Sequence, residues 1–473
     1  MLQLTELTVL VLAASFSQWT SLPGLLFIAG VLQAGSVLNI VTPAAVATGV
    51  AAYGLTPFQF LAPWVVLAGF WRLWLGPRPP CPMHLRLPMI FLVLYTIVAI
   101  SSAWLLPQWF EGIKLNAVIQ KEGAFELTAL SHNISHVAQP LMLLLLVLVI
   151  IAFLSLVNDK LSKNALTRGI AMSAILAVSL GAYEQASPYF KWPSIALYWA
   201  NNPGYSQAPL APMGFVLNRV GLPFSEPSYA SAYMAAMTLG GLGVALMGRH
   251  WWLGLTAAFI CGLGLINTLG STGLASAVIA SCVLTLWVIL RSLKGSENLS
   301  RRLRAAMLCC ILLVANTWGY KVLQASPNRP HVEAMVKGLI IDKVKLNDGV
   351  REKINQRALE ILIETKGLGV GLGSHRASSF FASLLANTGI LGFILFMAML
   401  GSLLWRYWKA PALTDMQIFV AAALPTATLA MGLGIPDLNL PMYWGFIFLG
   451  FVFCPGNEAN EIDGGGSCPH ERA

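Results

Sequence analysis

Runs of about 20 consecutive apolar residues recur along this chain of 473 residues, and each run is long enough to cross the hydrocarbon core of a bilayer as an α-helix. The runs are continuous and do not alternate between apolar and polar positions, which argues against a β-barrel. Only 10% of the residues are charged, whereas a soluble domain carries about 25%. The sequence therefore predicts an all-α, polytopic integral membrane protein.

Short basic loops between the apolar runs set the expected orientation. They lie at Arg72–Arg86, Asn158–Arg168, Arg249–His250, Arg291–Arg304 and Arg406–Lys409. The positive-inside rule places such loops in the cytoplasm, and an even number of spans fits between each consecutive pair. The net charge of +9 is therefore interpreted as a record of topology, and no nucleic-acid partner is expected.

This orientation predicts where the helices cross the membrane. Spans are expected at residues 88–106, 139–157, 169–186, 228–247, 251–268, 272–290, 305–322, 379–404, 416–434 and 440–454. About three or four more are expected in the first 76 residues, which gives a total of about 12–14 transmembrane helices. Residues 1–454 are predicted to form a single multi-span membrane domain, and the Gly-rich, polar segment 455–473 a disordered cytoplasmic tail.

Two sizeable periplasmic loops are expected, at about 186–227 and 323–378. The second loop is unusual because the stretch from Ser326 to Arg376 holds nine of the 29 Lys and Arg residues of the chain. Positive charge on the translocated side opposes the charge bias of membrane topology. We expect the charge to serve function there, by holding an anion.

A first polar constellation ends the 186–227 loop. Arg219 and Glu226 are expected at the membrane surface, close to the start of the next span, with Ser225 as the capping residue of that helix. Pro227 suits the first turn of the helix. The alternative is that Glu226 only complements the helix dipole and that Arg219 only anchors the interface.

A second constellation surrounds Arg351. Val350, Ile354, Ala358 and Ile361 recur at helical spacing, which predicts an amphipathic helix along the membrane surface with Arg351 near its N-terminus. A guanidinium is unfavourable at that end of a helix unless a bound anion compensates it, and its fork suits phosphate oxygens. The alternative is an ordinary solvated basic face.

A third constellation is a glycine string that precedes a span. Gly369, Gly371 and Gly373 alternate with apolar residues and lead to His375 and Arg376. No βαβ unit surrounds them, so a dinucleotide fingerprint is excluded. Alternating glycines allow the backbone to approach a ligand and leave amide N–H groups free for an anion. The alternative is a flexible re-entrant linker.

Aromatic residues in the 186–227 loop, among them Trp192 and Trp199, could stack on sugar rings, although an interfacial aromatic belt is the alternative. His132 and His136 have the spacing of a metal pair but no third ligand accompanies them. The seven cysteines show no zinc-binding spacing. We therefore expect neither a metal site nor a cofactor.

Taken together and in this order, the constellations resemble the bacterial O-antigen polymerase and ligase superfamily, Wzy and WaaL. The large periplasmic loop of that family resembles Asp348–Arg351, Ala358-Leu359 and the glycine string. The closing Gly-x-x-Gly of its next span resembles Gly389–Gly392, and Arg219 with Phe224–Pro227 resembles its other functional loop. The resemblance covers about residues 210–454.

The resemblance implies a metal-independent glycosyltransferase of the bacterial inner membrane. Its donor would be an oligosaccharide linked through diphosphate to undecaprenol, with membrane lipid and a chain-length regulator as further partners. A sugar hydroxyl would attack the anomeric carbon of the donor. The resemblance assigns Arg219, Arg351 and Arg376 to the diphosphate, and Glu226 or His375 to the acceptor hydroxyl.

Ligases of this superfamily carry a His followed by Asn, Ser or Gln, with nine residues between that pair and the closing Gly-x-x-Gly, and here Ser378 and Ser379 stand at that place. His375 lies three residues too early, which favours a polysaccharide polymerase over a ligase that transfers glycan to lipid A–core. A transporter or flippase for lipid-linked sugars is the alternative from another class. It would need charged or broken helices inside the membrane, whereas the expected spans carry almost no charge.

Overall fold

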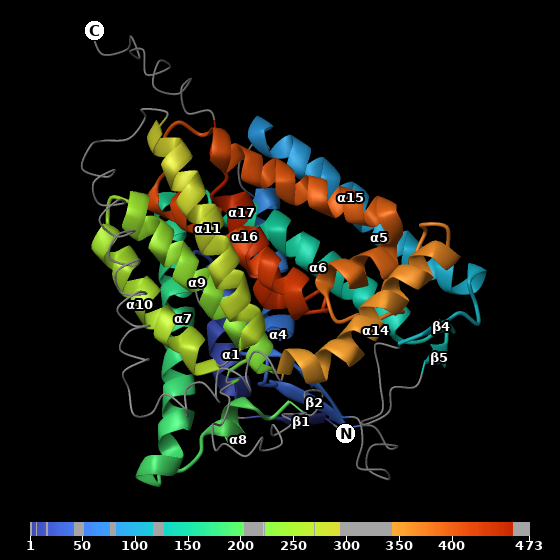
Figure 1. Ribbon diagram of the computed structural model, residues 1–473. Helices are drawn as coiled ribbons and strands as arrows, with labels where there is room; N and C mark the ends of the chain where they lie inside the picture. Colours follow the sequence, from blue (N-terminus) through green and yellow to red (C-terminus); the bar gives the residue numbers. More distant parts are fainter. Residues whose placement is uncertain are drawn as a thin grey trace.

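A computed structural model describes residues 2–5, 7–15, 18–41, 52–75, 82–116, 127–202, 221, 223–268, 270–293 and 343–456. Helices dominate this part of the chain (Figure 1). Nine of the described helices are long and apolar enough to span a membrane. They are α4 (Pro57–Leu75), α5 (Arg86–Trp109), α6 (Ser135–Leu156), α7 (Lys160–Phe190), α9 (Pro227–Met247), α10 (Trp251–Thr268), α11 (Ser271–Leu293), α15 (Phe380–Lys409) and α16 (Asp415–Gly434). The protein is thus a multi-pass helical membrane protein.

Shorter helices complete the described part of the chain. They are α1 (Leu7–Ser15), α2 (Leu22–Val31), the 3-10 helix η1 (Met83–Leu85), α8 (Ala196–Trp199), α14 (Lys343–Glu364) and α17 (Pro441–Val452). The first 76 residues, where three or four spans were expected, contribute one helix of spanning length among the described residues, α4. The expected span 305–322 and the tail from residue 457 lie outside the described ranges.

Two small sheets depart from the expected all-helical architecture. Strands β1 (Leu2–Leu4), β2 (Leu38–Val41) and β3 (Ala52–Leu55) form an antiparallel sheet, in which Leu38 pairs with both Leu4 and Leu55. Strands β4 (Lys114–Leu115) and β5 (Thr128–Ala129) form a second antiparallel pair. The sequence analysis missed these strands because each is short and its partner lies many residues away, beyond the reach of a local hydropathy pattern.

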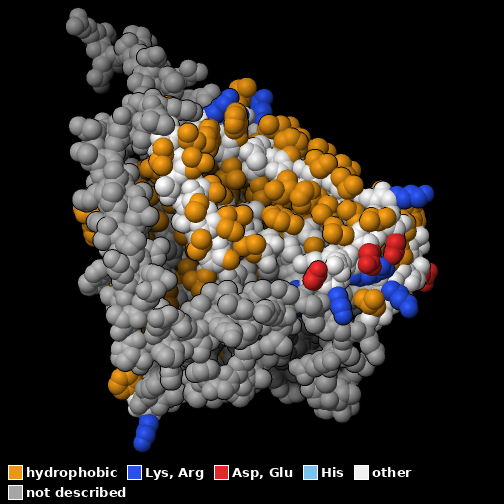
Figure 2. Space-filling view, in the orientation of Figure 1, with side chains coloured by type: hydrophobic (Ala, Val, Ile, Leu, Met, Phe, Trp, Pro, Cys, Tyr) orange, Lys and Arg blue, Asp and Glu red, His pale blue; other side chains and the backbone are white. Residues whose placement is uncertain are grey.

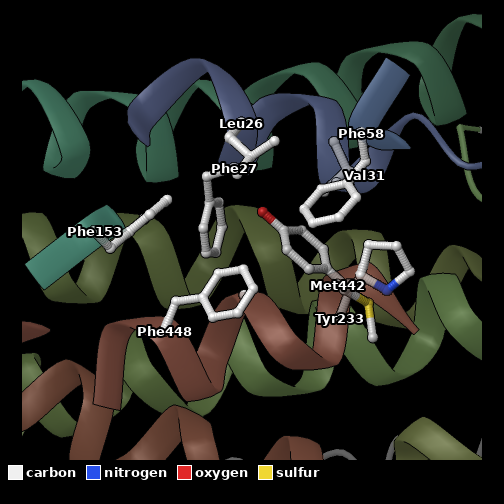
Figure 3. A pocket seen from close by; sticks show the side chains of 11 residues that line it. Leu26, Phe27, Val31, Phe58, Phe153, Tyr233, Met442 and Phe448 are labelled. Atoms are coloured by element: carbon white, nitrogen blue, oxygen red, sulfur yellow. The ribbon is translucent and has the colours of Figure 1, made fainter. Parts of the chain in front are cut away.

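Helix α9 packs against α10, α11 and α16. Its glycines allow close helix crossing: a Cβ atom added to Gly241 would lie 2.8 Å from the Ala258 nitrogen of α10. Beside α9, the rings of Phe27, Phe153 and Phe448 gather around Tyr233 (Figure 3). The cavity left between them measures about 10 Å³, which is at the lower limit of the space that a water molecule needs.

The helix ends that carry the five basic loops meet at one end of the bundle. Contacts across this end are Arg72 Nη2 to Asp159 Oδ2 at 3.5 Å, His250 Nδ1 to Asp415 Oδ2 at 2.6 Å, and Arg291 Nη2 to the Ala410 carbonyl at 2.9 Å. Figure 2 shows Lys and Arg side chains at this end, at the top of the view, above a broad hydrophobic belt. The described ends of the five loops thus share one side, as their parity predicted.

One of these basic loops is helical in part. Helix α7 begins at Lys160, so the expected loop from 158 to 168 supplies its first turns. Asp159 caps the helix, because its carboxylate accepts a hydrogen bond of 2.7 Å from the Ser162 N–H, and this bond lowers the pKa of Asp159. The basic residues of this expected loop therefore belong to the first turns of α7 and extend that helix beyond its apolar stretch.

Candidate functional site

A polar cluster forms where three separate segments meet at the end of the bundle opposite the basic loops. It consists of Glu226 and Tyr229 at the start of α9, Arg376 before α15, and Asp437 between α16 and α17. Arg376 Nη2 lies 3.7 Å from Asp437 Oδ1, and the Tyr229 hydroxyl donates a short hydrogen bond to Asp437 Oδ2. The Asp437 carboxylate raises the pKa of Arg376 above its ordinary value, against the effect of partial burial.

Two asparagines hold the backbone that carries Arg376. The Arg376 N–H donates to the Asn116 carbonyl at 2.9 Å, and Asn116 Nδ2 donates to the Arg376 carbonyl at 2.7 Å. From the other side, the His375 N–H donates to Asn387 Oδ1 at 3.0 Å, and Asn387 Nδ2 returns a bond of 2.7 Å to the His375 carbonyl. The guanidinium itself remains partly exposed, with 39% of the side chain accessible.

The glycine string packs against protein. Gly369, Gly371 and Gly373 have φ angles of +80°, +100° and +94°, which favour glycine. The amide of Gly369 donates to Thr365 Oγ1 and that of Gly371 donates to the Asn387 carbonyl, both at 2.9 Å. The expectation that these amides are free for an anion is therefore wrong at Gly369 and Gly371.

Close approach to neighbouring helices explains why glycine occurs at these positions. A Cβ atom at Gly371 would lie 2.7 Å from the Ser102 carbonyl oxygen of α5, and one at Gly373 would lie 2.7 Å from the Ser135 carbonyl oxygen of α6. Gly389, the first glycine of the Gly-x-x-Gly, has a φ of +68° that interrupts α15. It allows the Ile390 N–H to bond the Gly367 carbonyl at 2.9 Å. The glycines thus dock the segment before α15 onto the bundle.

His375 is buried, with 2% of its surface exposed. Its Nδ1 accepts a bond of 3.2 Å from the Asn116 N–H, and its buried Nε2 has no hydrogen bond of good geometry, although the Ile354 backbone is near. Burial lowers the pKa of His375 to about 4, with the charge of Arg357 acting in the same direction. In this position the ring cannot touch an acceptor hydroxyl, which argues against the role expected for it.

Arg351 lies well inside α14. The helix begins at Lys343, eight residues earlier, so the expected position at its N-terminus is wrong and the dipole argument fails, because that effect is confined to the first turn. The amphipathic pattern is confirmed, since Ala358 and Ile361 are fully buried. A Cβ atom at Gly434 would lie 3.4 Å from Arg351 Nη1. Arg351 therefore lies beside the last residue of α16, three residues before Asp437.

The start of α9 differs in detail from the expectation. Helix α9 begins at Pro227, so the residue at the capping position is Glu226, which makes no capping bond through its side chain. The Ser225 hydroxyl is buried without a hydrogen-bond partner, so the expected cap at Ser225 is wrong. Glu226 is exposed and accepts a bond of 3.0 Å from Ser228 Oγ.

The aromatic residues of the first loop have separate surroundings. Tyr183 and Phe190 lie two turns apart on α7, and the Trp192 ring stacks on both, at centroid distances of 5.5 and 5.0 Å. Trp192 nevertheless remains 49% exposed, so its stacking on a sugar ring stays a prediction. Trp199 is half-buried against the core beside Gly35. Neither tryptophan has a recorded contact with the polar cluster among the described residues.

Sequence reasoning missed Asp437, Tyr229 and Asn116. Asp437 carried a signal, because it is the only acidic residue between Asp415 and Glu458 and stands between two apolar runs. Tyr229 and Asn116 carried none, since their roles depend on partners far along the chain. Arg219 lies outside the described part of the chain, so its relation to the cluster stays a prediction.

No group of three or more His, Cys, Asp and Glu side chains within the described ranges could hold a metal ion. His136 is fully buried; its Nδ1 accepts from the Asn133 N–H at 3.0 Å and its Nε2 lies 2.8 Å from Ser374 Oγ. Nε2 thus contacts the segment that carries Arg376, while Nδ1 holds the turn before α6. A separate apolar cavity of about 160 Å³ lies between α11, α15 and α16, lined in part by Trp287 and Trp408.

The geometry of the polar cluster is the basis for the function proposed below. No protein-family model matches this chain, and no curated protein matches it.

Proposed function

We propose that this protein is a membrane glycosyltransferase that polymerises polysaccharide, by joining oligosaccharide repeat units carried on undecaprenyl diphosphate. One observation supports this proposal above the others: Arg376 and Asp437, both partly exposed, lie side by side where the ends of the two loops meet. A cation for a phosphate and a carboxylate for a hydroxyl are the two groups that glycosyl transfer from a lipid diphosphate requires.

The cations act on the leaving group. When the bond between the anomeric carbon and the diphosphate oxygen breaks, negative charge grows on the diphosphate, and preorganised cations stabilise the transition state most where that charge develops. Arg376 lies beside Asp437 in the α16–α17 connection, and Arg351 lies beside Gly434 at the end of α16. Within the described residues Arg351 forms no salt bridge, and its guanidinium fork is proposed to bind phosphate oxygens. Arg219 is proposed as a third cation.

The membrane body suits a lipid-linked donor. Hydrophobic side chains cover the middle of the face in Figure 2, and charged side chains gather over α14 at its edge. A polyprenyl chain would lie in the membrane beside this belt while its diphosphate reaches the arginines. We propose that this edge is the periplasmic face of the bacterial inner membrane and that a chain-length regulator binds there.

The packed core supports surface chemistry over passage. A flippase needs a polar path between its helices, whereas the cavities of about 10 Å³ beside α9 and about 160 Å³ between α11, α15 and α16 are both lined mainly by apolar side chains. The burial of His375 supports polymerase over ligase, since the family resemblance gives ligases a His with a functional role.

The decisive experiment is polymer formation by purified protein in liposomes that contain undecaprenyl diphosphate-linked repeat units. Arg376→Ala should lower the rate roughly 30- to 1,000-fold, as expected for a loss of about 2–4 kcal/mol of transition-state stabilisation. Arg376→Lys should be nearly as damaging, because Lys keeps the charge but loses the fork.

Lys353→Ala is the matched control, since Lys353 is an exposed cation of α14. Polymer is seen as a ladder of products that differ by one repeat unit, and wild-type protein that forms no ladder would refute the proposed polymerase activity. Movement of the lipid-linked unit across the bilayer without ladder formation would indicate the flippase, and transfer of glycan to lipid A–core would indicate the ligase.

A further inference from the structure

Asp437 is held so that one carboxylate oxygen is bound and the other is available. The hydroxyl of Tyr229, which is only 2% exposed, donates to Oδ2. Oδ1 lies 3.7 Å from Arg376 Nη2, beyond the 2.7–3.0 Å that a direct charge-assisted bond usually spans. No hydrogen bond to Oδ1 occurs among the described residues. With 36% of the side chain exposed, Oδ1 can accept a proton from a group that enters from outside.

The rival bases are less suitable. The His375 ring is buried with Nδ1 already occupied. Glu226 is exposed at the start of α9, and its charge acts on Arg376. Its hydrogen bond among the described residues comes from Ser228 Oγ, two residues away, so no buried donor from another segment holds it. Among the described residues, the charged and titratable groups near Asp437 are Tyr229 and Glu226 at the start of α9, Arg376 from the segment before α15, and Arg351 of α14, which lies beside Gly434. Asp437 is therefore the carboxylate that a buried donor, Tyr229, holds in place and that lies beside a cation, Arg376.

We propose that Asp437 is the general base of the glycosyl transfer and that Tyr229 is its positioning residue, an inference that rests on the proposed function. The acceptor hydroxyl oxygen bonds to the anomeric carbon of the donor as its proton passes to Asp437 Oδ1. The bond from that carbon to the diphosphate oxygen breaks, and its electron pair leaves with the diphosphate, facing Arg376. One proton is transferred, one C–O bond forms and one breaks, so no further reactant is required.

The first test compares Asp437→Asn with wild-type protein in the liposome assay. General-base catalysis contributes about 10²- to 10⁴-fold, so kcat should fall within that range. The KM for the lipid-linked donor should not rise, because loss of the carboxylate leaves Arg376 free for the diphosphate. The acidic limb of the wild-type pH profile, where protonation of the base lowers kcat/KM, should be absent in Asp437→Asn.

The second test uses Tyr229→Phe, which removes one hydroxyl and keeps the buried ring. It should lower kcat roughly 10-fold and shift the acidic limb, because the carboxylate loses the donor that holds it. Asp437→Glu should restore part of the activity. A purely structural role for Asp437 would instead lower the unfolding temperature and the activity together and leave the limb in place, and that result would overturn the proposal.

Glu226→Gln is the matched comparison. Loss of the acidic limb in Glu226→Gln with its retention in Asp437→Asn would assign the base to Glu226 and overturn the proposal. Wild-type protein that forms no polymer would refute the proposed function itself. Active wild-type protein together with a fully active Asp437→Asn variant would refute only the inference, so the two failures are distinguishable.

Discussion

Gly371 shows how a single residue sets the position of the site. Its φ is +100°, and a Cβ atom there would lie 2.7 Å from the Ser102 carbonyl oxygen and 2.9 Å from Pro107 Cδ. No side chain can be accommodated without moving α5 or the segment that leads to Arg376. The position of α5 therefore determines where the segment that carries Arg376 lies.

Gly371→Ala should lower the free energy of unfolding by about 1–3 kcal/mol, because a residue with a side chain is strained at this φ. Gly401→Ala is the control, since Gly401 lies inside α15 with nothing within 4 Å of its added Cβ. That change should be neutral or stabilise by up to about 1 kcal/mol. Unfolding of both variants in detergent measures the difference, and equal shifts would contradict the packing of the glycine segment.

The buried His375 should make stability depend on pH. Burial lowers its pKa from 6.5 to about 4. Between pH 6.5 and 4 the folded protein therefore keeps the ring neutral, whereas the unfolded chain binds a proton. The contribution of His375 to the free energy of unfolding is thus fully present above pH 6.5 and is lost as the pH falls toward 4. A shift of this size corresponds to about 3 kcal/mol.

His375→Gln removes this titration and should flatten the fall in unfolding temperature between pH 6.5 and 4. His250→Gln is a suitable control, because the side chain of His250 is 58% exposed at the opposite end of the bundle. An unchanged pH dependence in His375→Gln would show that the imidazole can bind a proton in the folded protein.

The β4–β5 pair and α14 form a frame around the segment that carries Arg376. Arg357 Nε donates to the Lys114 carbonyl at 2.8 Å, which fixes α14 to β4. Leu115, Val370 and Ala358 belong to one small hydrophobic cluster beneath this contact. A strand pair that no local pattern of the sequence predicted thus supports the polar cluster.

Asn116→Ala tests this frame. It removes the bond from Asn116 Nδ2 to the Arg376 carbonyl and should lower both polymer formation and stability, the latter by about 1–3 kcal/mol if that carbonyl stays unsatisfied. Lys114→Ala is the control in the same strand, because its exposed side chain is lost while its backbone carbonyl remains. Equal activity in the two variants would argue against a positioning role for Asn116.

The whole molecule separates two polar ends with a hydrophobic belt between them (Figure 2). Arg72, His250 and Arg291 mark one end, and the polar cluster marks the other. Because the basic loops share one end, the positive-inside rule predicts the orientation of the whole bundle in the membrane.

Cysteine labelling in spheroplasts tests this orientation. Glu352→Cys, on the exposed side of α14, should react with an impermeant thiol reagent in intact cells, whereas Lys163→Cys on α7 should react only after lysis. The parent chain with its seven native cysteines gives the background. The reverse pattern would place the polar cluster in the cytoplasm and remove the basis for a periplasmic polymerase.

Much of the helical framework was predictable from local hydropathy. The expected span 228–247 corresponds to α9 at Pro227–Met247, and 88–106 corresponds to α5 at Arg86–Trp109. Each boundary depends on residues within one stretch of chain, so a local pattern suffices. The strands were not predictable in this way, because Leu38 finds its partners Leu4 and Leu55 only after the chain has folded back.

The sequence by itself determined that this is a helical membrane protein and where the basic loops between its spans lie, because the cost of placing charge in hydrocarbon acts on each segment independently. Only the tertiary structure decided which polar groups meet. Tyr229 and Asp437 are 208 residues apart and share a hydrogen bond, while His375, adjacent to Arg376, is buried. Burial and partnership arise from packing between segments, and no local property of the sequence records them.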